Sequence, residues 1–330
     1  MKKIQRELKN LFQGSPGSYR YRHDKVLRRY AGVILPHVIE GSLQHGWRSD
    51  SGVTEPERAV HFVWNRSNFQ KAREEGLQNV TPIGAPFLYL PPLKRGGRVH
   101  ERGLIAMPAH GWEKASILDP VRTYDEYASR LEELKRFYNP VTVCLYWIEY
   151  RNREITALFE RRGISVVTVG HSSRKDFLEA WRRTVEPYAY VTSNEICTSV
   201  FYGLHMGKRV FLYGTPMKRC NNDSVYLNNL SRRFAAVTEA YGKKYPVLLR
   251  ENFDDRPHPE IAAEELGLEF RQSPAALRRL MKWSPRDFIC RAASRCLPAA
   301  KSLADFLRRQ AARKLRPLSF PAEPPRSFAP

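Results

Sequence analysis

The stretch 188–214, YAYVTSNEICTSVFYGLHMGKRVFLYG, constrains the fold most, because it contains a complete strand–loop–helix–strand unit. A β-rich run ends near Tyr190, and the Ser193 and Asn194 that follow are good helix N-cap residues. Apolar residues then recur at helical spacing until Gly207, a typical residue for a helix end. A continuous apolar run comes next, as in a buried parallel strand. The unit therefore predicts a parallel sheet covered by helices.

The second half of the chain repeats this alternation of strands and helices. The runs GLIAMPA, VTVCLYWI and ISVVTVG have the composition of buried strands, and segments of helical composition separate them. A stretch rich in Pro, Gly and Lys breaks the pattern at 91–98, and we place a domain boundary there. We expect an α/β fold with two Rossmann-like lobes, 1–98 and 99–284, each with a parallel sheet, a cleft between them, and a basic helical tail at 285–330.

Three predicted loops follow parallel strands, at 110–116, 170–175 and 192–199. The carboxyl ends of parallel strands lie at one edge of the sheet, where ligands bind in such folds, so we expect these loops to converge. All three carry His, Ser, Thr, Asn or Lys side chains. Hydroxyl groups and free N–H groups at a helix start can hold a phosphate. An ordinary capped helix gives the same pattern in the third loop, so both interpretations stay open.

The formal net charge of the 330-residue chain is +21, which implies an anionic partner: nucleic acid, acidic phospholipid or a phosphorylated substrate. The five cysteines include no C-x-x-C pair, so we expect neither a disulfide framework nor a zinc site, and a reducing cytoplasm as the compartment. The sequence has no Walker A loop, no G-x-G-x-x-G, no H-E-x-x-H and no D-x-D. We therefore expect no bound metal and no cofactor.

Short motifs occur in a fixed order over residues 30–215: Gln44–His45–Gly46, Gly84–Ala85–Pro86, Met107–Pro108–Ala109–His110, and Thr192–Ser193–Asn194 with Thr198–Ser199–Val200–Phe201. In this order they resemble bacterial GT-B-type glycosyltransferases of surface-polysaccharide synthesis and, more distantly, the CDP-glycerol glycerophosphotransferases. The phosphotransferases have an aspartate where this chain has Ser193 and an arginine where it has Phe87. These departures favour a sugar donor. The resemblance implies an acceptor-side first lobe and a second lobe that binds the nucleotide donor.

The candidate catalytic residue is His45, which lies in a predicted loop beside Gly46. A histidine with a near-neutral pKa can take the proton of the acceptor hydroxyl as the donor bond breaks. Asp50 and Glu40 flank the loop as reserve bases. A loop histidine without a role is the alternative. The candidate donor-binding residues are His110, His171, Ser172, Ser193, Asn194, Thr198 and Ser199.

The tail alternates basic and apolar residues over 286–316, and Pro298 divides it into two predicted helices. A basic amphipathic helix favours contact with an anionic membrane surface, whereas packing against the body of the protein is the alternative. The proline-rich end, 317–330, is expected to be disordered.

These features together predict an inverting, metal-independent glycosyltransferase. It would move a sugar from a nucleotide-sugar donor to a lipid-linked or polysaccharide acceptor in capsule or lipopolysaccharide synthesis, as a cytoplasmic protein peripheral to the inner face of the membrane. One alternative is a CDP-polyol phosphotransferase, and another is a non-catalytic basic protein that binds nucleic acid or acidic lipid. Nucleic acid is the less favoured partner, because the basic residues are spread over many segments without a recognised nucleic-acid module.

Overall fold

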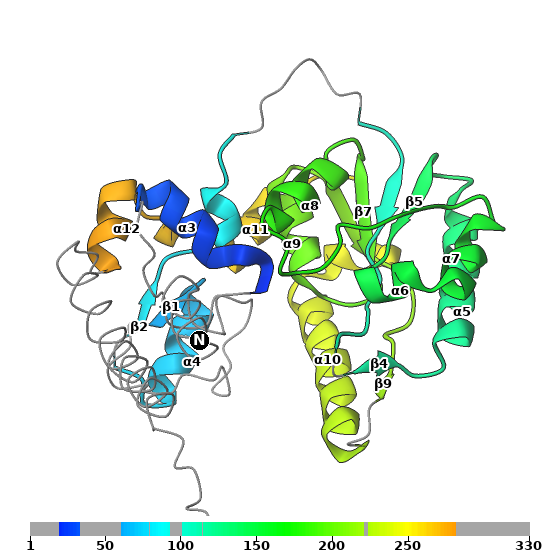
Figure 1. Ribbon diagram of the computed structural model, residues 1–330, viewed down its shortest axis with the longest axis horizontal. Helices are drawn as coiled ribbons and strands as arrows, with labels where there is room; N and C mark the ends of the chain where they lie inside the picture. Colours follow the sequence, from blue (N-terminus) through cyan, green and yellow to red (C-terminus); the bar gives the residue numbers. More distant parts are fainter. Residues whose placement is uncertain are drawn as a thin grey trace, which may run out of the picture.

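The computed structural model describes residues 20–33, 61–78, 80–92, 101–113, 115–220 and 224–281 (Figure 1). The predicted catalytic residue His45, the reserve bases Glu40 and Asp50, and the tail at 285–330 lie outside these ranges.

A five-stranded, wholly parallel sheet forms the centre of the larger part of the molecule, with the strand order β6-β5-β3-β7-β8. In this sheet Ile105 of the central strand pairs with Thr142 on one side and Val191 on the other. The strands are short and mostly buried, because helices cover both faces. Their bounds are β3 Leu104–Ala106, β5 Val141–Cys144, β6 Ser165–Val167, β7 Tyr190–Ser193 and β8 Arg209–Leu212.

Successive residues of a strand point to opposite faces of the sheet, and the side chains on the two faces belong to two separate apolar cores. On one face, Leu104 and Ala106 pack with residues of α5 (Pro120–Leu134) and α7 (Arg153–Glu160). On the other face, Ile105 packs with residues of α8 (Phe177–Val185) and α9 (Thr198–His205). The remaining elements beside this sheet are α6 Trp147–Arg151, α10 Ser224–Lys244, and an antiparallel pair made of β4 Ser116–Ile117 and β9 Arg219–Cys220.

The smaller part joins the start of the chain to its end, as Figure 1 shows on the left. It contains a parallel strand pair and helices from both ends of the chain, and a short 3₁₀ helix, Pro86–Tyr89, lies against α3. The ring of Phe87 stacks on Tyr202 of α9 with 4.1 Å between centroids, so this part and the sheet share one apolar core. Its elements are α3 His23–Ala31, β1 His61–Val63, α4 Arg66–Glu74, β2 Val80–Pro82, α11 Pro259–Glu265 and α12 Pro274–Leu280.

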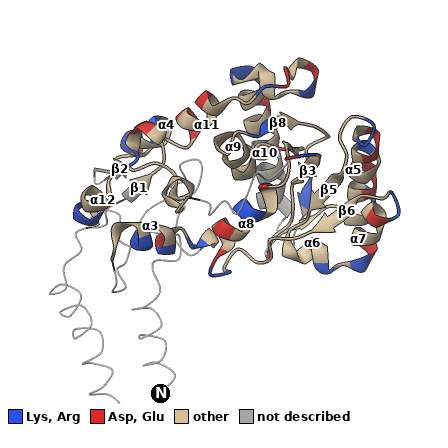
Figure 2. Ribbon diagram, turned by 90° about the horizontal axis from the view of Figure 1, so that it is seen from above, with Lys and Arg blue, Asp and Glu red and all other residues tan. Residues whose placement is uncertain are grey.

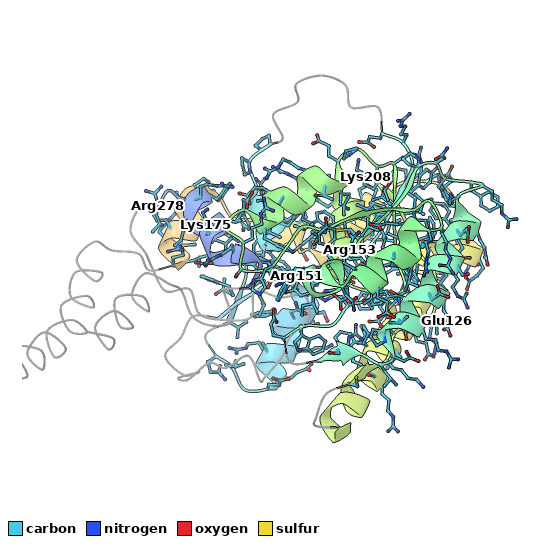
Figure 3. All side chains as sticks on the ribbon, turned by 45° about the vertical axis from the view of Figure 1, so that its right-hand side comes forward. Glu126, Arg151, Arg153, Lys175, Lys208 and Arg278 are labelled. Carbon is cyan, nitrogen blue, oxygen red and sulfur yellow. The ribbon has the colours of Figure 1, made fainter. Side chains whose placement is uncertain are left out.

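Charged side chains are spread over both parts of the molecule (Figure 2). Lys175 and Arg278 lie toward the end that carries α3 and α12, whereas Arg151 and Arg153 lie at α6 and α7 (Figure 3). Lys208 is one of several buried charged residues, and it pairs with Glu101 at 2.8 Å. Within the described ranges, no helix combines the length and the apolar composition that a membrane span requires.

The predicted α/β class with parallel sheets is confirmed. The domain boundary at 91–98 stays a prediction. Contacts cross it: α12 packs with α3, and Glu265 of α11 accepts a hydrogen bond from Asn65. One expectation about the central unit is wrong. The helix after β7 begins at Thr198 and has Cys197 as its N-cap, so Ser193 and Asn194 do not cap it. Their polar groups make other contacts, described below.

Candidate functional site

The strand order reverses between β3 and β7, at the middle of the sheet. From β3 the chain continues to β5 and β6 on one side and then crosses back to β7 on the other side. The loops after β3 and β7 therefore leave the sheet in opposite directions, and in open parallel sheets the crevice between two such loops is where ligands bind. We call this place the switch point.

Asn194 holds the two loops of the switch point together. Its Oδ1 accepts a hydrogen bond from the N–H of Ala109 at 2.7 Å, and its Nδ2 donates to the carbonyl of Thr215 at 2.8 Å. The N–H of Met107 also donates to the carbonyl of Thr192 at 2.7 Å. Asn194 is buried, and these contacts engage both ends of its amide. It therefore shapes the crevice, and direct contact with a ligand stays a prediction.

Ser193 closes a tight turn just after β7. Its hydroxyl donates to the carbonyl of Glu195 at 2.8 Å and lies 3.3 Å from the N–H of the same residue. The side chain is buried. Such a local bond between a serine and the backbone replaces the helix cap that the sequence predicted.

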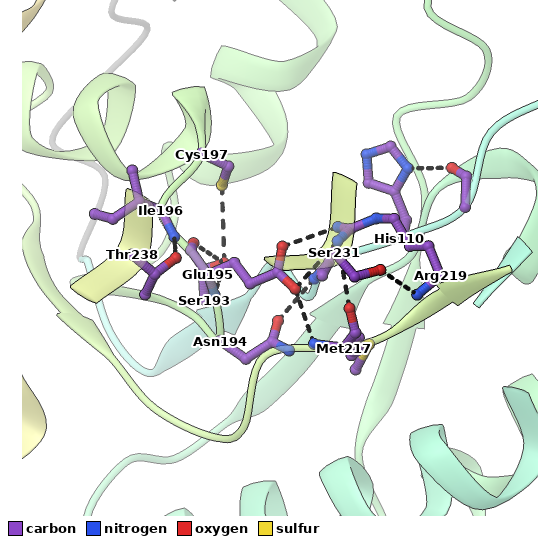
Figure 4. A network of polar contacts seen from close by, with 12 residues as sticks. His110, Ser193, Asn194, Glu195, Ile196, Cys197, Met217, Arg219, Ser231 and Thr238 are labelled. Carbon is purple, nitrogen blue, oxygen red and sulfur yellow. Dashed lines mark hydrogen bonds and ion pairs between the residues drawn. The ribbon is translucent and has the colours of Figure 1, made fainter. Parts of the chain in front are cut away.

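The most buried ionic contact of the switch point is a pair that the sequence did not reveal (Figure 4). Glu195 follows the turn, and its Oε2 lies 2.9 Å from Nη2 of Arg219 on β9, with both side chains buried. Oε1 accepts the N–H of Met217 at 2.8 Å. The guanidinium group also lies 4.3 Å from the ring centroid of Phe234. The partners are distant in the sequence, so no local pattern predicts them.

His110 lies at the end of the loop after β3 with one ring nitrogen engaged. Nδ1 contacts the carbonyl oxygen of Gly111 (Figure 4). The ring stacks on Tyr146 with 4.4 Å between centroids. Burial lowers the pKa of His110, because the charged imidazolium loses solvation. The next N–H, that of Gly111, donates to Oε1 of Glu149 at 2.7 Å. The histidine is thus held on a fixed backbone.

Only glycine fits at position 111. A Cβ atom there would lie 2.7 Å from the carbonyl oxygen of Ala115 and 3.1 Å from Oε1 of Glu149. The peptide group before His110 is fixed as well, because the Tyr124 hydroxyl donates to the carbonyl of Ala109 at 3.0 Å. The loop therefore cannot move His110 without breaking several buried hydrogen bonds.

His171 joins the loop after β6 to the loop after β3. Its Nε2 lies 2.9 Å from Oε1 of Glu113, and its Nδ1 accepts the N–H of Ser173 at 3.0 Å. Both nitrogens are therefore engaged, although the side chain is exposed. The neighbouring Ser172 hydroxyl lies 3.4 Å from the hydroxyl of Tyr146. Both residues lie beside the ring that stacks on His110.

The start of α9 is the part of the switch point best suited to an anion. No side-chain cap hydrogen bond is made at this helix start, although the N–H of Val200 donates to the carbonyl of Cys197 at 3.1 Å. Thr198 is half-buried at its first position, and no hydrogen bond of its hydroxyl occurs among the described residues. Ser199 lies next to it and accepts from Nε1 of Trp181 at 3.2 Å.

A hollow of about 440 Å³ adjoins the switch point at the ends of β7 and β8. Its surface is more apolar than polar, although two arginines and two threonines contribute to it, and Glu251 adds a carboxylate. It is lined by Arg130, Asn194, Leu212, Tyr213, Gly214, Thr215, Pro216, Thr238, Leu249, Arg250 and Glu251.

The structure thus brings together the three loops that the sequence predicted to converge. Glu113 connects the first loop to His171, and Asn194 connects it to the third loop. Among the described residues, no group of three or more His, Cys, Asp or Glu side chains is arranged to hold a metal ion. The functional roles of His110, His171 and Thr198 stay predictions.

No protein-family model matches the chain, and no curated protein matches it. Among solved structures it is similar to a mutant of S. aureus TarM in complex with Fondaparinux, alpha-GlcNAc-glycerol and UDP. That match has 12% identity and a TM-score of 0.28, and it covers 64% of this chain and 44% of TarM. A second similar structure is UDP-GlcNAc 2-epimerase from Neisseria meningitidis bound to UDP-GlcNAc. That match has 10% identity and a TM-score of 0.35, and it covers 79% of this chain and 71% of the epimerase chain. The chain therefore spans less than half the length of the TarM structure.

Proposed function

We propose that the protein is a glycosyltransferase that uses a nucleotide-sugar donor, and that the donor binds at the switch point. The observation that carries this proposal is the convergence of three polar loops at the place where the strand order reverses. In open parallel sheets this is the usual position for a nucleotide. The donor diphosphate would lie at the uncapped start of α9, near Thr198.

The chemistry needs stabilisation of the leaving diphosphate and a base for the acceptor. The start of α9 and the hydroxyl of Thr198 would supply the first, because a fixed helix terminus stabilises developing negative charge without rearrangement. His45, in the part of the chain outside the described residues, is the expected base. The transfer would then need no metal and no cofactor besides the co-substrate.

Calorimetry with UDP-GlcNAc, UDP, GDP, CDP and CMP tests the proposal. We expect a uridine or guanosine diphosphate to bind, and Thr198→Val to weaken that binding about tenfold by removing one hydrogen bond to a charged group. The matched control is Thr184→Val, which makes the same change in the last turn of α8, away from the carboxyl edge of the sheet. Unchanged affinity in the Thr198 variant would move the donor elsewhere.

The same titrations separate the competing functions. Binding of CDP and CMP in preference to the other nucleotides would favour the CDP-polyol phosphotransferase. Failure of the wild-type protein to bind any nucleotide would leave a non-catalytic basic protein.

The acceptor in this proposal is lipid-linked or polymeric, and the enzyme works at the cytoplasmic face of a membrane during capsule or lipopolysaccharide synthesis. The support is the basic composition of the chain and of its tail.

A further inference from the structure

The loop of His110 holds one tautomer of its imidazole. The partner of Nδ1 is the carbonyl oxygen of Gly111, which can only accept a hydrogen bond. Nδ1 must therefore carry a proton. In the neutral ring the other nitrogen, Nε2, then has a free lone pair and acts as an acceptor. No hydrogen bond of Nε2 occurs among the described residues.

The surroundings of His110 favour the neutral ring. Two carboxylates face it, Glu149 from α6 and Glu195 after β7, and both favour a charged imidazolium. Arg219 from β9 opposes them and pairs with Glu195 at 2.9 Å. The ring itself stacks on Tyr146. Burial outweighs the two carboxylates and lowers the pKa of His110, so Nε2 is unprotonated at neutral pH.

A neutral Nε2 cannot bind a phosphate, because both groups are acceptors and a phosphate offers no proton. We propose that Nε2 of His110 accepts a hydrogen bond from a hydroxyl group of the bound nucleotide-sugar, and that His110 does not contact the diphosphate. This inference rests on the proposed function and replaces the phosphate contact that the sequence suggested for His110. In this arrangement the loop after β3 contacts the hydroxyl groups of the sugar or the ribose, and the start of α9 contacts the diphosphate.

The pH dependence of nucleotide-sugar affinity tests the inference. The diphosphate of UDP-GlcNAc is esterified at both ends and does not titrate near neutral pH. A change of affinity with pH therefore reports the titration of groups on the protein. Above its lowered pKa, His110 is neutral and accepts the hydroxyl proton. Below that pKa, Nε2 is protonated and no longer accepts, so a hydroxyl held in the donating orientation must turn to accept, which weakens the contact. We expect affinity to fall about three- to tenfold as the pH falls through this pKa.

Two variants form a matched pair for the same titration. In His110→Gln the amide can place an oxygen near the position of Nε2, whereas in His110→Asn the side chain is too short to do so. We expect His110→Gln to keep most of the affinity without the pH dependence, and His110→Asn to lose three- to tenfold at every pH. Affinity that rises as the pH falls, or equal losses in the two variants, would overturn the inference.

A measurement on the free protein separates this inference from the proposed function. In ¹⁵N-labelled protein, the ring nitrogen shifts of His110 report which nitrogen carries the proton. We expect the Nδ1–H form. The Nε2–H form would refute the inference whatever the protein binds. If the Nδ1–H form is found and no nucleotide-sugar binds, the proposed function fails and the assignment of a hydroxyl ligand fails with it.

Discussion

At the scale of single residues, the Glu195–Arg219 pair shows how much the switch point depends on buried charge. Both side chains are almost fully buried, and the carboxylate also accepts the N–H of Met217. A buried ion pair gains little over apolar packing, but removing one partner leaves an uncompensated charge away from water. The pair therefore fixes β9 against the turn after β7 more strictly than an apolar contact would.

Replacing Arg219 by methionine should lower the free energy of unfolding by about 3–5 kcal/mol, because it leaves the Glu195 carboxylate buried and unpaired. Urea denaturation measures the change. The control is Arg122→Met, which breaks the exposed pair with Glu126 and should cost less than about 1 kcal/mol. The double variant Glu195→Gln/Arg219→Met should recover part of the loss. Equal effects of the two arginine substitutions would contradict the prediction.

The sequence predicted which residue types gather at the switch point but not what each side chain does. His110, His171 and Asn194 could be placed there because each follows a parallel strand. The contacts around them could not be predicted, since Glu149 accepts the N–H of Gly111 beside His110, and Glu113 pairs with His171, from other elements. Single-sequence patterns show the period of an element and carry no information on contacts between elements.

At the scale of elements, one glycine lets segments that are distant in the sequence pack closely within the smaller part of the molecule. Gly267 follows α11 with φ +66°, and a Cβ atom there would lie 1.9 Å from the carbonyl oxygen of Trp64. Beside it, the N–H of Ala85 donates to the carbonyl of Leu266. Asn65 donates through Nδ2 to the carbonyl of Glu265 at 2.9 Å. Backbone from three separate segments meets here without space for a side chain.

Substitution of Gly267 by alanine should therefore destabilise the protein more than the same change at Gly207. Both glycines have positive φ, +66° and +75°, so both variants bear the left-handed backbone cost of about 1–2 kcal/mol. Only at Gly267 does the new methyl group meet backbone atoms, because nothing lies within 4 Å at Gly207. We expect an additional loss of about 1–3 kcal/mol in urea denaturation. Equal losses of stability in the two variants would mean that the backbone segments around Gly267 move apart to accept the methyl group at no cost.

Elements whose sequence pattern is local were predicted well, and those set by tertiary contacts were not. The alternation of strands and helices in 99–220 follows from apolar periodicity and is present in the structure. The start of α9 was placed too early, because Ser193 bonds within its own turn. The contacts of α12 with α3 and of α11 with Asn65 have no signature in the sequences of α11 and α12.

At the scale of the whole molecule, one apolar core crosses the predicted domain boundary. It contains Leu27 and Phe62 from before the boundary, and Val191 and Leu277 from after it. The rings of Trp64 and Tyr202 approach to 6.3 Å between centroids across this core. A ligand at the switch point and an acceptor bound by the first part of the chain would therefore meet on one continuous body.

The net charge of +21 is also a property of the whole chain, and it supports the last prediction. We expect the full-length protein to bind vesicles that contain anionic phospholipid and not neutral vesicles, with binding that weakens as salt rises because ions screen the charges. Deleting 285–330 should abolish vesicle binding and leave UDP-GlcNAc affinity intact, since basic residues recur in the tail at 286, 291, 295, 301, 308, 309, 313, 314 and 316. Co-sedimentation measures the first effect and calorimetry the second. Undiminished vesicle binding by the truncated protein would assign the contact to the basic residues of the body, and loss of nucleotide binding would make the tail part of the folded core.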